Sequence, residues 1–195
     1  MSPKAFAVLA GTTAVSVALA AWAVAGRDLP INAAGQPEPM FPGLIDRVNE
    51  VQTVQVTGGS AGLTLERTPA GSWVVKERGG YPAEAQRVRE LALGLANLTL
   101  VEAKTARPER LGRLELDDPS KPEAKSRRVE LLDKDGKALA SAVVGKTKFG
   151  LYGAGRAGVY VRRGGEEQAW LAAGELDVPD TPTAVVPRWV RCTAP

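Results

Sequence analysis

The fold is decided by residues 51–77, which read VQTVQVTGGSAGLTLERTPAGSWVVKE. Apolar and polar residues alternate in VQTVQV, GLTLER and SWVVKE, and a period of two is typical of strands with one buried face. Gly58-Gly59 and Pro69-Ala70-Gly71 provide turn signals between these segments. The stretch therefore predicts a three-stranded antiparallel meander.

One amphipathic helix is predicted after the meander, from Pro82 to Leu98. Proline suits the first turn of a helix, and Glu84 suits its N-terminal end. Apolar side chains recur every three or four residues and form one stripe, made of Val88, Leu91, Leu95 and Leu98. We expect this stripe to pack on the meander, and a partner-binding groove is the alternative interpretation.

A second group of strands is predicted after residue 128. Val129 and Leu131 alternate with polar residues, and the turn signal Asp133-Lys134-Asp135-Gly136 follows them. Further strands are predicted at residues 138–144, 159–162 and 168–171. The predicted fold class is therefore α+β, with antiparallel β meanders packed with one main amphipathic helix and preceded by an N-terminal transmembrane helix.

The transmembrane helix is predicted because no charged residue occurs from Ala5 to Gly26. As a helix, this stretch is long enough for a hydrocarbon core of about 30 Å. Apolar anchor residues are spread along it, namely Phe6, Leu9, Val15, Leu19 and Trp22. The alternative is a cleaved signal peptide, because Ala23-Val24-Ala25 fits a cleavage site, although the apolar region is longer than signal peptides usually have.

Orientation follows from the charges that flank this segment. Lys4 and the terminal amine precede it, whereas the charge of Arg27 is offset by Asp28. The positive-inside rule then places the N-terminus in the cytoplasm and the following domain outside. We expect a single-pass protein of the bacterial inner membrane, with its C-terminal domain on the periplasmic side and the lipid bilayer as a partner.

Composition divides the chain into four parts. Residues 1–27 form the membrane anchor or signal segment, and residues 28–43 form a tether rich in proline and glycine. Residues 44–178 form the α+β domain. Residues 179–195 are rich in proline and show no periodicity, which predicts an irregular, disordered tail.

Composition also argues against several chemistries. The chain has no histidine, which removes histidine-activated serine and cysteine nucleophiles and most zinc sites. Its single cysteine, Cys192, cannot form an internal disulfide. Of the 25 Lys and Arg residues, 23 remain when Lys4 and Arg27 are set aside, against 22 Asp and Glu. A nucleic-acid binder usually has a stronger basic bias, so no nucleic-acid partner is predicted.

Three short motifs resemble ligand sites but lie in the wrong context. Gly145-Lys146-Thr147 follows a strand pattern, whereas the lysine of a P-loop opens a helix. The G-x-G-x-x-G at residues 153–158 precedes a strand, whereas the dinucleotide-binding version precedes a helix. The acidic turn at residues 133–136 lacks the later ligands of a calcium loop.

Two charged groups have ordinary explanations as well. Glu115, Asp117 and Asp118 fit one acidic turn before a proline, and a carboxylate pair for acid–base or metal chemistry is the alternative. The three arginines 107, 110 and 113 fit a solvated helical face better than an anion site. We therefore predict no catalytic residue, no metal and no cofactor.

The order of these segments resembles the bacterial family DUF4340, a domain of unknown function. The resemblance covers roughly residues 44–178 and rests on LTLER, SWVVKE, YPAE, LELDDP, VVGK and GVYVRR, in that order. The matching residues are Trp73, Tyr81, Pro82, Asp117, Asp118, Pro119, Gly145 and Tyr160. The resemblance implies an envelope protein without an established activity, and family members look like partners of gliding-motility-type ABC transport systems. Members usually continue further, so the sequence after Val178 predicts a shortened C-terminus.

The predicted function is a membrane-anchored, non-catalytic envelope domain that assists ABC transporter subunits. The first alternative is a small-ligand or polymer-binding module, which an exposed pair of Tyr160 and Trp170 would support. The second is a carboxylate-based hydrolase, which requires Glu115 or Asp118 to face another carboxylate across a cleft.

Overall fold

The computed structural model describes residues 38–58, 61–151 and 156–179, together with Thr13, Ser16 and Val185. The chain divides into two units, residues 1–30 and 31–195, and the fold described below belongs to the second. The predicted anchor residues Phe6, Leu9, Val15, Leu19 and Trp22 lie outside the described residues. In the part of the chain that is described, no helix combines the length and the apolar character needed to span a bilayer.

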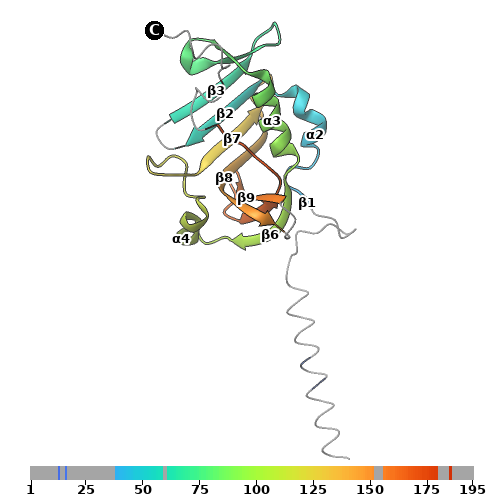
Figure 1. Ribbon diagram of the computed structural model, residues 1–195, viewed down its shortest axis with the longest axis vertical. Coiled ribbons are helices and arrows are strands. Elements are labelled where there is room, and N and C mark those ends of the chain that lie inside the picture. Colours follow the sequence, from blue (N-terminus) through green and yellow to red (C-terminus); the bar gives the residue numbers. More distant parts are fainter. Residues whose placement is uncertain are drawn as a thin grey trace, which may run out of the picture. The chain divides into compact units, whose positions relative to one another are not determined.

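The described residues form one ten-stranded antiparallel sheet and a few short helices (Figure 1). The sheet order is β1-β6-β10-β9-β8-β7-β2-β3-β4-β5. The strands are β1 Glu38–Pro39, β2 Thr53–Gly58, β3 Ala61–Arg67, β4 Trp73–Val75, β5 Tyr81–Ala83, β6 Thr99–Thr105, β7 Arg127–Leu132, β8 Ala138–Leu151, β9 Arg156–Arg163 and β10 Ala169–Ala173. The helices are α2 Leu44–Arg47, α3 Ala85–Ala96 and α4 Pro108–Leu111, with 3-10 turns η1 Val48–Glu50, η2 Lys76–Arg78 and η3 Gly112–Leu114.

The predicted fold class was α+β, with antiparallel β meanders packed with one main amphipathic helix and preceded by an N-terminal transmembrane helix. It is wrong, because the described residues form mostly one ten-stranded antiparallel sheet with a few short helices, and no described helix could span a bilayer. Each meander is present, since β2, β3 and β4 pair in chain order, as do β7, β8, β9 and β10. However, β2 also pairs with β7, with Val54 opposite Leu131 and Val56 opposite Val129. The two meanders are therefore halves of a single sheet. Alternation predicts which residues face the core, but it does not predict which distant strand pairs with which.

The predicted start of the helix is wrong as well. Helix α3 begins at Ala85, and Pro82 instead lies in the edge strand β5, opposite Val74 of β4. Proline has no N–H to donate, so it is tolerated on an edge strand as readily as in the first turn of a helix. A proline in an edge strand and a proline in the first turn of a helix therefore give the same local sequence pattern.

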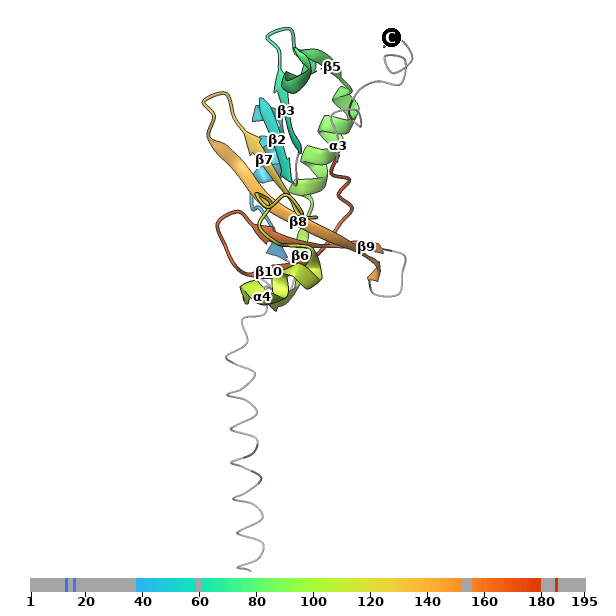
Figure 2. The ribbon, with the colours of Figure 1, turned by 90° about the vertical axis from the view of Figure 1, so that its left-hand side faces the viewer.

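The inner face of the sheet, defined here as the face that α3 covers, carries the main core. The predicted helical stripe is confirmed, because Val88, Leu91 and Leu95 are 2%, 2% and 0% exposed. These side chains form one cluster with inward residues of both halves of the sheet, such as Val54 and Val161. Figures 1 and 2 show α3 lying across one face of the sheet, and Figure 1 shows α2 beside it. One helix thus holds both meanders together.

The outer face is covered over only part of its area in the described residues. The covering segment is residues 108–126, called here the lobe, which contains α4 and η3. A second, smaller cluster lies under it and consists of Leu111, Leu116, Val143 and Ala169. Because Val143 is in β8 and Ala169 is in β10, the lobe packs on the centre of the second meander.

Candidate functional site

The lobe is held to the sheet by a close backbone contact at Gly145 of β8. A Cβ atom at this position would clash with the carbonyl oxygen of Leu114 and would lie 2.8 Å from that of Glu115. The pairing of β8 with β9 is also irregular between Val144 and Thr147. Gly145, one of the residues on which the family resemblance rests, therefore allows the lobe backbone to approach the strand.

One hydrogen bond closes the lobe on itself, and a second attaches the lobe to β8. The Ser126 hydroxyl is fully buried and donates to the Asp117 carbonyl oxygen at 2.7 Å. On the other side of the lobe, Lys146 Nζ donates to the Arg113 carbonyl oxygen at 2.7 Å and lies 5.7 Å from the centre of the Tyr160 ring. The Gly-Lys-Thr motif therefore contacts the lobe, whereas Asp117 takes part in a hydrogen bond within the lobe.

The carboxylates that were considered for acid–base chemistry contact neighbouring residues of the lobe. Glu115 lies 3.5 Å from Lys125 Nζ. Asp118 Oδ1 accepts hydrogen bonds from the backbone N–H and the hydroxyl of Ser120, and these bonds lower the pKa of Asp118 below its usual value of 3.8. Both contacts are typical of an exposed turn.

Other candidate residues also lie in ordinary positions. The turn at Asp133 is confirmed, because Asp133 Oδ1 accepts the N–H groups of Asp135 and Lys137 at 2.9 Å each. The side chains of Arg107, Arg110 and Arg113 are exposed along α4 and η3. The motif at residues 153–158 lies partly outside the described residues, and its described part, from Arg156, begins strand β9.

Tyr160 and Trp170 do not form an exposed pair. Tyr160 packs beside the small cluster under the lobe, whereas Trp170 packs against the main core. In the register of β9 and β10, Trp170 is opposite Val161, and Tyr160 is opposite Leu171. The two rings are therefore on opposite faces of the sheet, which argues against an aromatic platform for a polymer.

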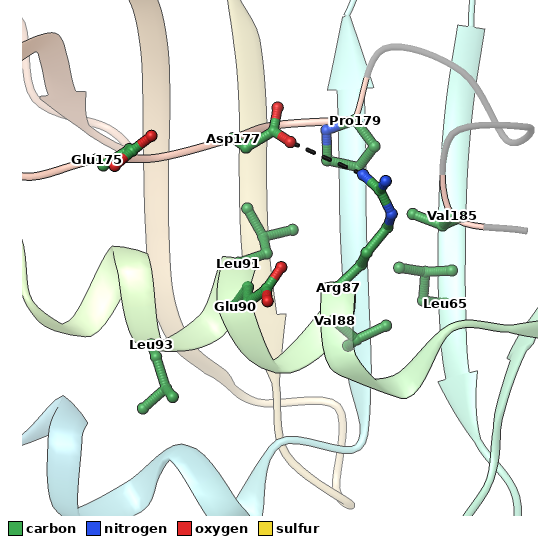
Figure 3. Close-up of a pocket in the computed structure, with 10 residues that line it drawn as sticks. All are labelled: Leu65, Arg87, Val88, Glu90, Leu91, Leu93, Glu175, Asp177, Pro179 and Val185. Carbon is green, nitrogen blue, oxygen red and sulfur yellow. Dashed lines mark ion pairs between the residues drawn. The ribbon is translucent and has the colours of Figure 1, made fainter. Parts of the chain in front are cut away.

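A pocket of about 460 Å³ lies between α3 and the segment 174–179 (Figure 3). We call it the α3 pocket. Its apolar wall is made of side chains that are at most 4% exposed, namely Leu65, Val88, Leu91 and Val185. The volume lies within the range of small-molecule sites, which is about 300–1,000 Å³.

The rim of the α3 pocket is charged. Three exposed carboxylates, those of Glu90, Glu175 and Asp177, face one guanidinium, that of Arg87. Arg87 lies 3.2 Å from the carboxylate of Glu84 and 3.9 Å from that of Asp177, toward which it points in Figure 3. The rim therefore carries an excess of negative charge.

The segment 174–179 can lie against α3 because residue 94 is a glycine. A Cβ atom at Gly94 would lie 3.0 Å from Leu176 Cδ1 and 3.1 Å from the Glu175 carbonyl oxygen. Glycine in the interior of a helix lowers helix stability by about 1 kcal/mol relative to alanine. The close packing of residues 174–179 offsets this loss. Leu176 and Val178 then pack on the main core.

The sequence did not predict the α3 pocket. Arg87 and Glu90 lie off the predicted apolar stripe, and Glu175 and Asp177 belong to no periodic pattern. The one local signal was Gly94, since a glycine inside a helical pattern often marks a close packing contact. Nothing in the sequence indicated which segment would make that contact.

A smaller pocket of about 260 Å³ lies on the other side of α3, where α2 and η1 also contribute. Neither Glu115 nor Asp118 lines either pocket. Over the described residues, no group of three Asp, Glu or Cys side chains is arranged as a metal site.

The described residues thus form an antiparallel-sheet domain with one covering helix, an apolar pocket beside this helix and a lobe on the outer face. The chain belongs to the family described as domain of unknown function DUF4340, whose pattern matches residues 73–186. This confirms the resemblance that was drawn from the sequence. No curated protein and no solved structure matches the chain.

Proposed function

We propose that this chain is a non-catalytic accessory domain of the bacterial envelope, which acts outside the inner membrane beside an ABC-type transport system of the gliding-motility kind. The location is supported by the uncharged stretch from Ala5 to Gly26, which would attach the domain to the bilayer. The assignment to a transport system follows from what the resemblance described in the sequence analysis implies, whereas the family itself is described as a domain of unknown function.

The non-catalytic role is supported by the position of the residues that carry the family resemblance. Gly145 contacts the lobe backbone, the backbone carbonyl oxygen of Asp117 accepts the Ser126 hydrogen bond, and Tyr160 packs under the lobe. An enzyme family is expected to place its characteristic residues around a cleft with a nucleophile, an acid or a base. Here these three residues take part in packing and hydrogen bonds in or under the lobe, and none of them lines either pocket.

The location is tested by protease treatment of spheroplasts. A domain outside the inner membrane is degraded in intact spheroplasts, whereas a cytoplasmic control protein survives until the cells are lysed. Survival of the domain in intact spheroplasts would overturn the proposed location.

The accessory role is tested by mild cross-linking in cells, purification of the tagged chain in detergent and mass spectrometry. The control is a tagged chain that stops at residue 43, which keeps the apolar stretch and lacks the domain. Membrane subunits of an ABC transporter are expected to co-purify with the full chain above this control. Equal recovery with both chains would contradict the proposal.

A second function, binding of a small ligand, is favoured by one observation. The α3 pocket has a buried apolar wall and a charged rim, the combination that orients ligands in many binding sites. Native mass spectrometry of the purified protein is expected to detect a retained ligand as added mass. A spectrum with the mass of the bare chain alone would count against this function.

A further inference from the structure

We propose that the smaller of the two pockets binds a small organic anion, in which a carboxylate or phosphate group is joined to an apolar group. This pocket, called here the Trp73 pocket, is lined by residues of α3, of the segment 45–51 and of the end of β3, the turn after it and β4. The inference goes beyond the accessory role and does not depend on it. It also concerns a different site from the α3 pocket, although Val88 and Leu93 line both.

Regular spacing in three segments brings the lining residues of the Trp73 pocket together. Helix α3 contributes five positions that recur every three or four residues and so share one side of the helix, namely 85, 88, 89, 92 and 93. Ile45, Val48 and Asn49 have the same spacing in α2 and η1. Arg67 and Trp73 are directly opposite each other in β3 and β4, so their side chains lie on the same face of the sheet.

Part of the wall of the Trp73 pocket is apolar. Val51, Val88 and Ala92 are at most 4% exposed, and the half-buried Trp73 packs against the main core. Ile45, which also lines the pocket, is a large apolar side chain that remains 48% exposed. A ligand with an apolar group would remove this area from water, and an aromatic ring would pack favourably against the indole ring.

The charged side chains of the Trp73 pocket are both positive. Arg67 and Arg89 line it, and no carboxylate is among its described lining residues. Within the described part of the chain, neither guanidinium forms an ion pair or a side-chain hydrogen bond, whereas Arg87 of the same helix pairs with Glu84. A guanidinium presents a planar set of N–H donors that matches the oxygens of a carboxylate or phosphate. An anion would therefore supply partners that both arginines lack.

The sign of this charge distinguishes the Trp73 pocket from the α3 pocket. The rim of the α3 pocket has three carboxylates for one guanidinium and would repel an anion. The Trp73 pocket has a volume of about 260 Å³, the space of about nine water molecules. This volume is just below the range of about 300–1,000 Å³ that is typical of drug-sized ligands. The ligand is therefore expected to be small, with one ring or a short alkyl group beside its charge.

The experiment uses the two isoleucines of the chain, Ile31 and Ile45. Ile45 lines the Trp73 pocket and reports on binding, and Ile31→Val assigns the two signals. The full chain is labelled with ¹³C at the isoleucine methyl groups and placed in nanodiscs of zwitterionic lipid. Phenylpropionate and phenyl phosphate are then titrated separately, because each joins a ring to one anionic group. We expect the Ile45 signal to shift until it saturates, with a Kd of about 1 mM or lower, while the Ile31 signal stays in place. The probe that binds more tightly shows whether the pocket prefers a carboxylate or a phosphate.

Two comparisons test the role of the charge. Phenylpropionamide keeps the ring but is neutral, and we expect it to bind the native chain at least about tenfold more weakly than phenylpropionate. Arg67→Gln combined with Arg89→Gln changes two exposed side chains and should weaken phenylpropionate binding by at least about tenfold. The matched control is Arg87→Gln, which removes a guanidinium from the same helix at the rim of the α3 pocket and should leave the Kd unchanged.

Four results would overturn the proposal. The first is the absence of a saturable shift of the Ile45 signal with either anion, and the second is an equal shift of the Ile31 signal. The third is equal binding of the acid and the amide, which would mean that the pocket does not recognise charge. The fourth is an equal loss of binding in the control Arg87→Gln and in the double variant, which would mean that the general charge of the domain, and not Arg67 and Arg89, attracts the anion.

Discussion

Helix α3 and the lobe both cover the same sheet, but they are attached in different ways. Helix α3 contributes a stripe of side chains, including Val88, Leu91 and Leu95, to a cluster that extends over both meanders. The lobe contributes Leu111, Leu116 and the half-buried Leu114 to a small cluster, and its backbone otherwise contacts β8 at Gly145 and Lys146. Side-chain attachment leaves a periodic pattern in the sequence, whereas backbone attachment leaves only an isolated glycine.

The difference also predicts how the domain responds when the packing of α3 or of the lobe is lost. Loss of α3 packing would expose the core that joins the meanders, so it should unfold the whole domain. Loss of lobe packing would expose one patch of the outer face. The lobe is therefore expected to open as a local unit, of the kind that hydrogen exchange detects below the global unfolding limit.

The largest effect is expected from Leu95→Ala. Leu95 is fully buried under α3, so its truncation should lower the free energy of unfolding by about 2–5 kcal/mol, measured by denaturant unfolding. Leu116→Ala removes an equally buried side chain from the lobe and is the matched comparison. It should increase hydrogen exchange mainly at residues 108–126. Increased exchange throughout the sheet in Leu116→Ala would mean that the two covers belong to one cooperative unit.

The next effect is expected from Gly145→Val. The new side chain would clash with the carbonyl oxygens of Leu114 and Glu115, so the lobe should shift at a cost of about 1–3 kcal/mol. Unfolding in denaturant and hydrogen exchange of the lobe would measure this. Gly62→Ala is the control, because a Cβ at that strand position has nothing within 4 Å. Similar losses in both variants would show that strand glycine itself, and not the close contact, matters.

A smaller effect is expected from Ser126→Ala. The buried hydroxyl donates to the Asp117 carbonyl oxygen, so its removal should lower the free energy of unfolding by about 1 kcal/mol. Ser120→Ala removes an exposed hydroxyl from the same segment and should have almost no effect. If Ser120→Ala were the more damaging change, the turn at Asp118 would contribute more to the stability of the lobe than the buried hydrogen bond of Ser126.

The smallest effect concerns pH and the part of the outer face away from the lobe. Burial raises the pKa of Glu77, but hydrogen bonds with the backbone and hydroxyl of Thr64 outweigh it and lower this pKa below 4.5. A carboxyl group with a lowered folded-state pKa stabilises the fold above its unfolded pKa, and this contribution is lost as pH falls through the folded value. Thr64→Val should raise the pKa of Glu77 in an NMR titration. The variant should also lose less stability than the native chain between about pH 6 and about pH 3. An unchanged pKa of Glu77 would contradict this.

The parts of the fold that the sequence predicted are those set by side-chain periodicity. Alternation around Val54, Leu65 and Val129 predicted the strands, and spacing predicted the stripe of α3. The joining of β2 to β7 could not be predicted, because alternation assigns a face and not a partner. The place of Pro82 was predicted wrongly because an edge strand and the first turn of a helix both tolerate a residue without a backbone N–H.

The candidate site was harder to predict than the fold. The α3 pocket combines residues of one helix with Glu175 and Asp177, which follow the last strand, and with Val185, which comes from the proline-rich tail. The attachment of the lobe depends on Gly145, which has the local context of an ordinary strand residue. A glycine within a strand can indicate a close backbone approach, and this is the signal that could have located the lobe.

The edge strands of this sheet have a consequence for the behaviour of the protein at high local density. β1 is two residues long and contains Pro39, and β5 is three residues long and contains Pro82. Beyond β1, the open side of β6 carries Glu102 and Lys104, whose side chains are 2.5 Å apart. Short, proline-containing and charged edges are the features that prevent a sheet from adding strands of a neighbouring molecule. Copies of this chain crowded on one surface should therefore not polymerise through their backbones, and any assembly they form should use side chains on the two faces.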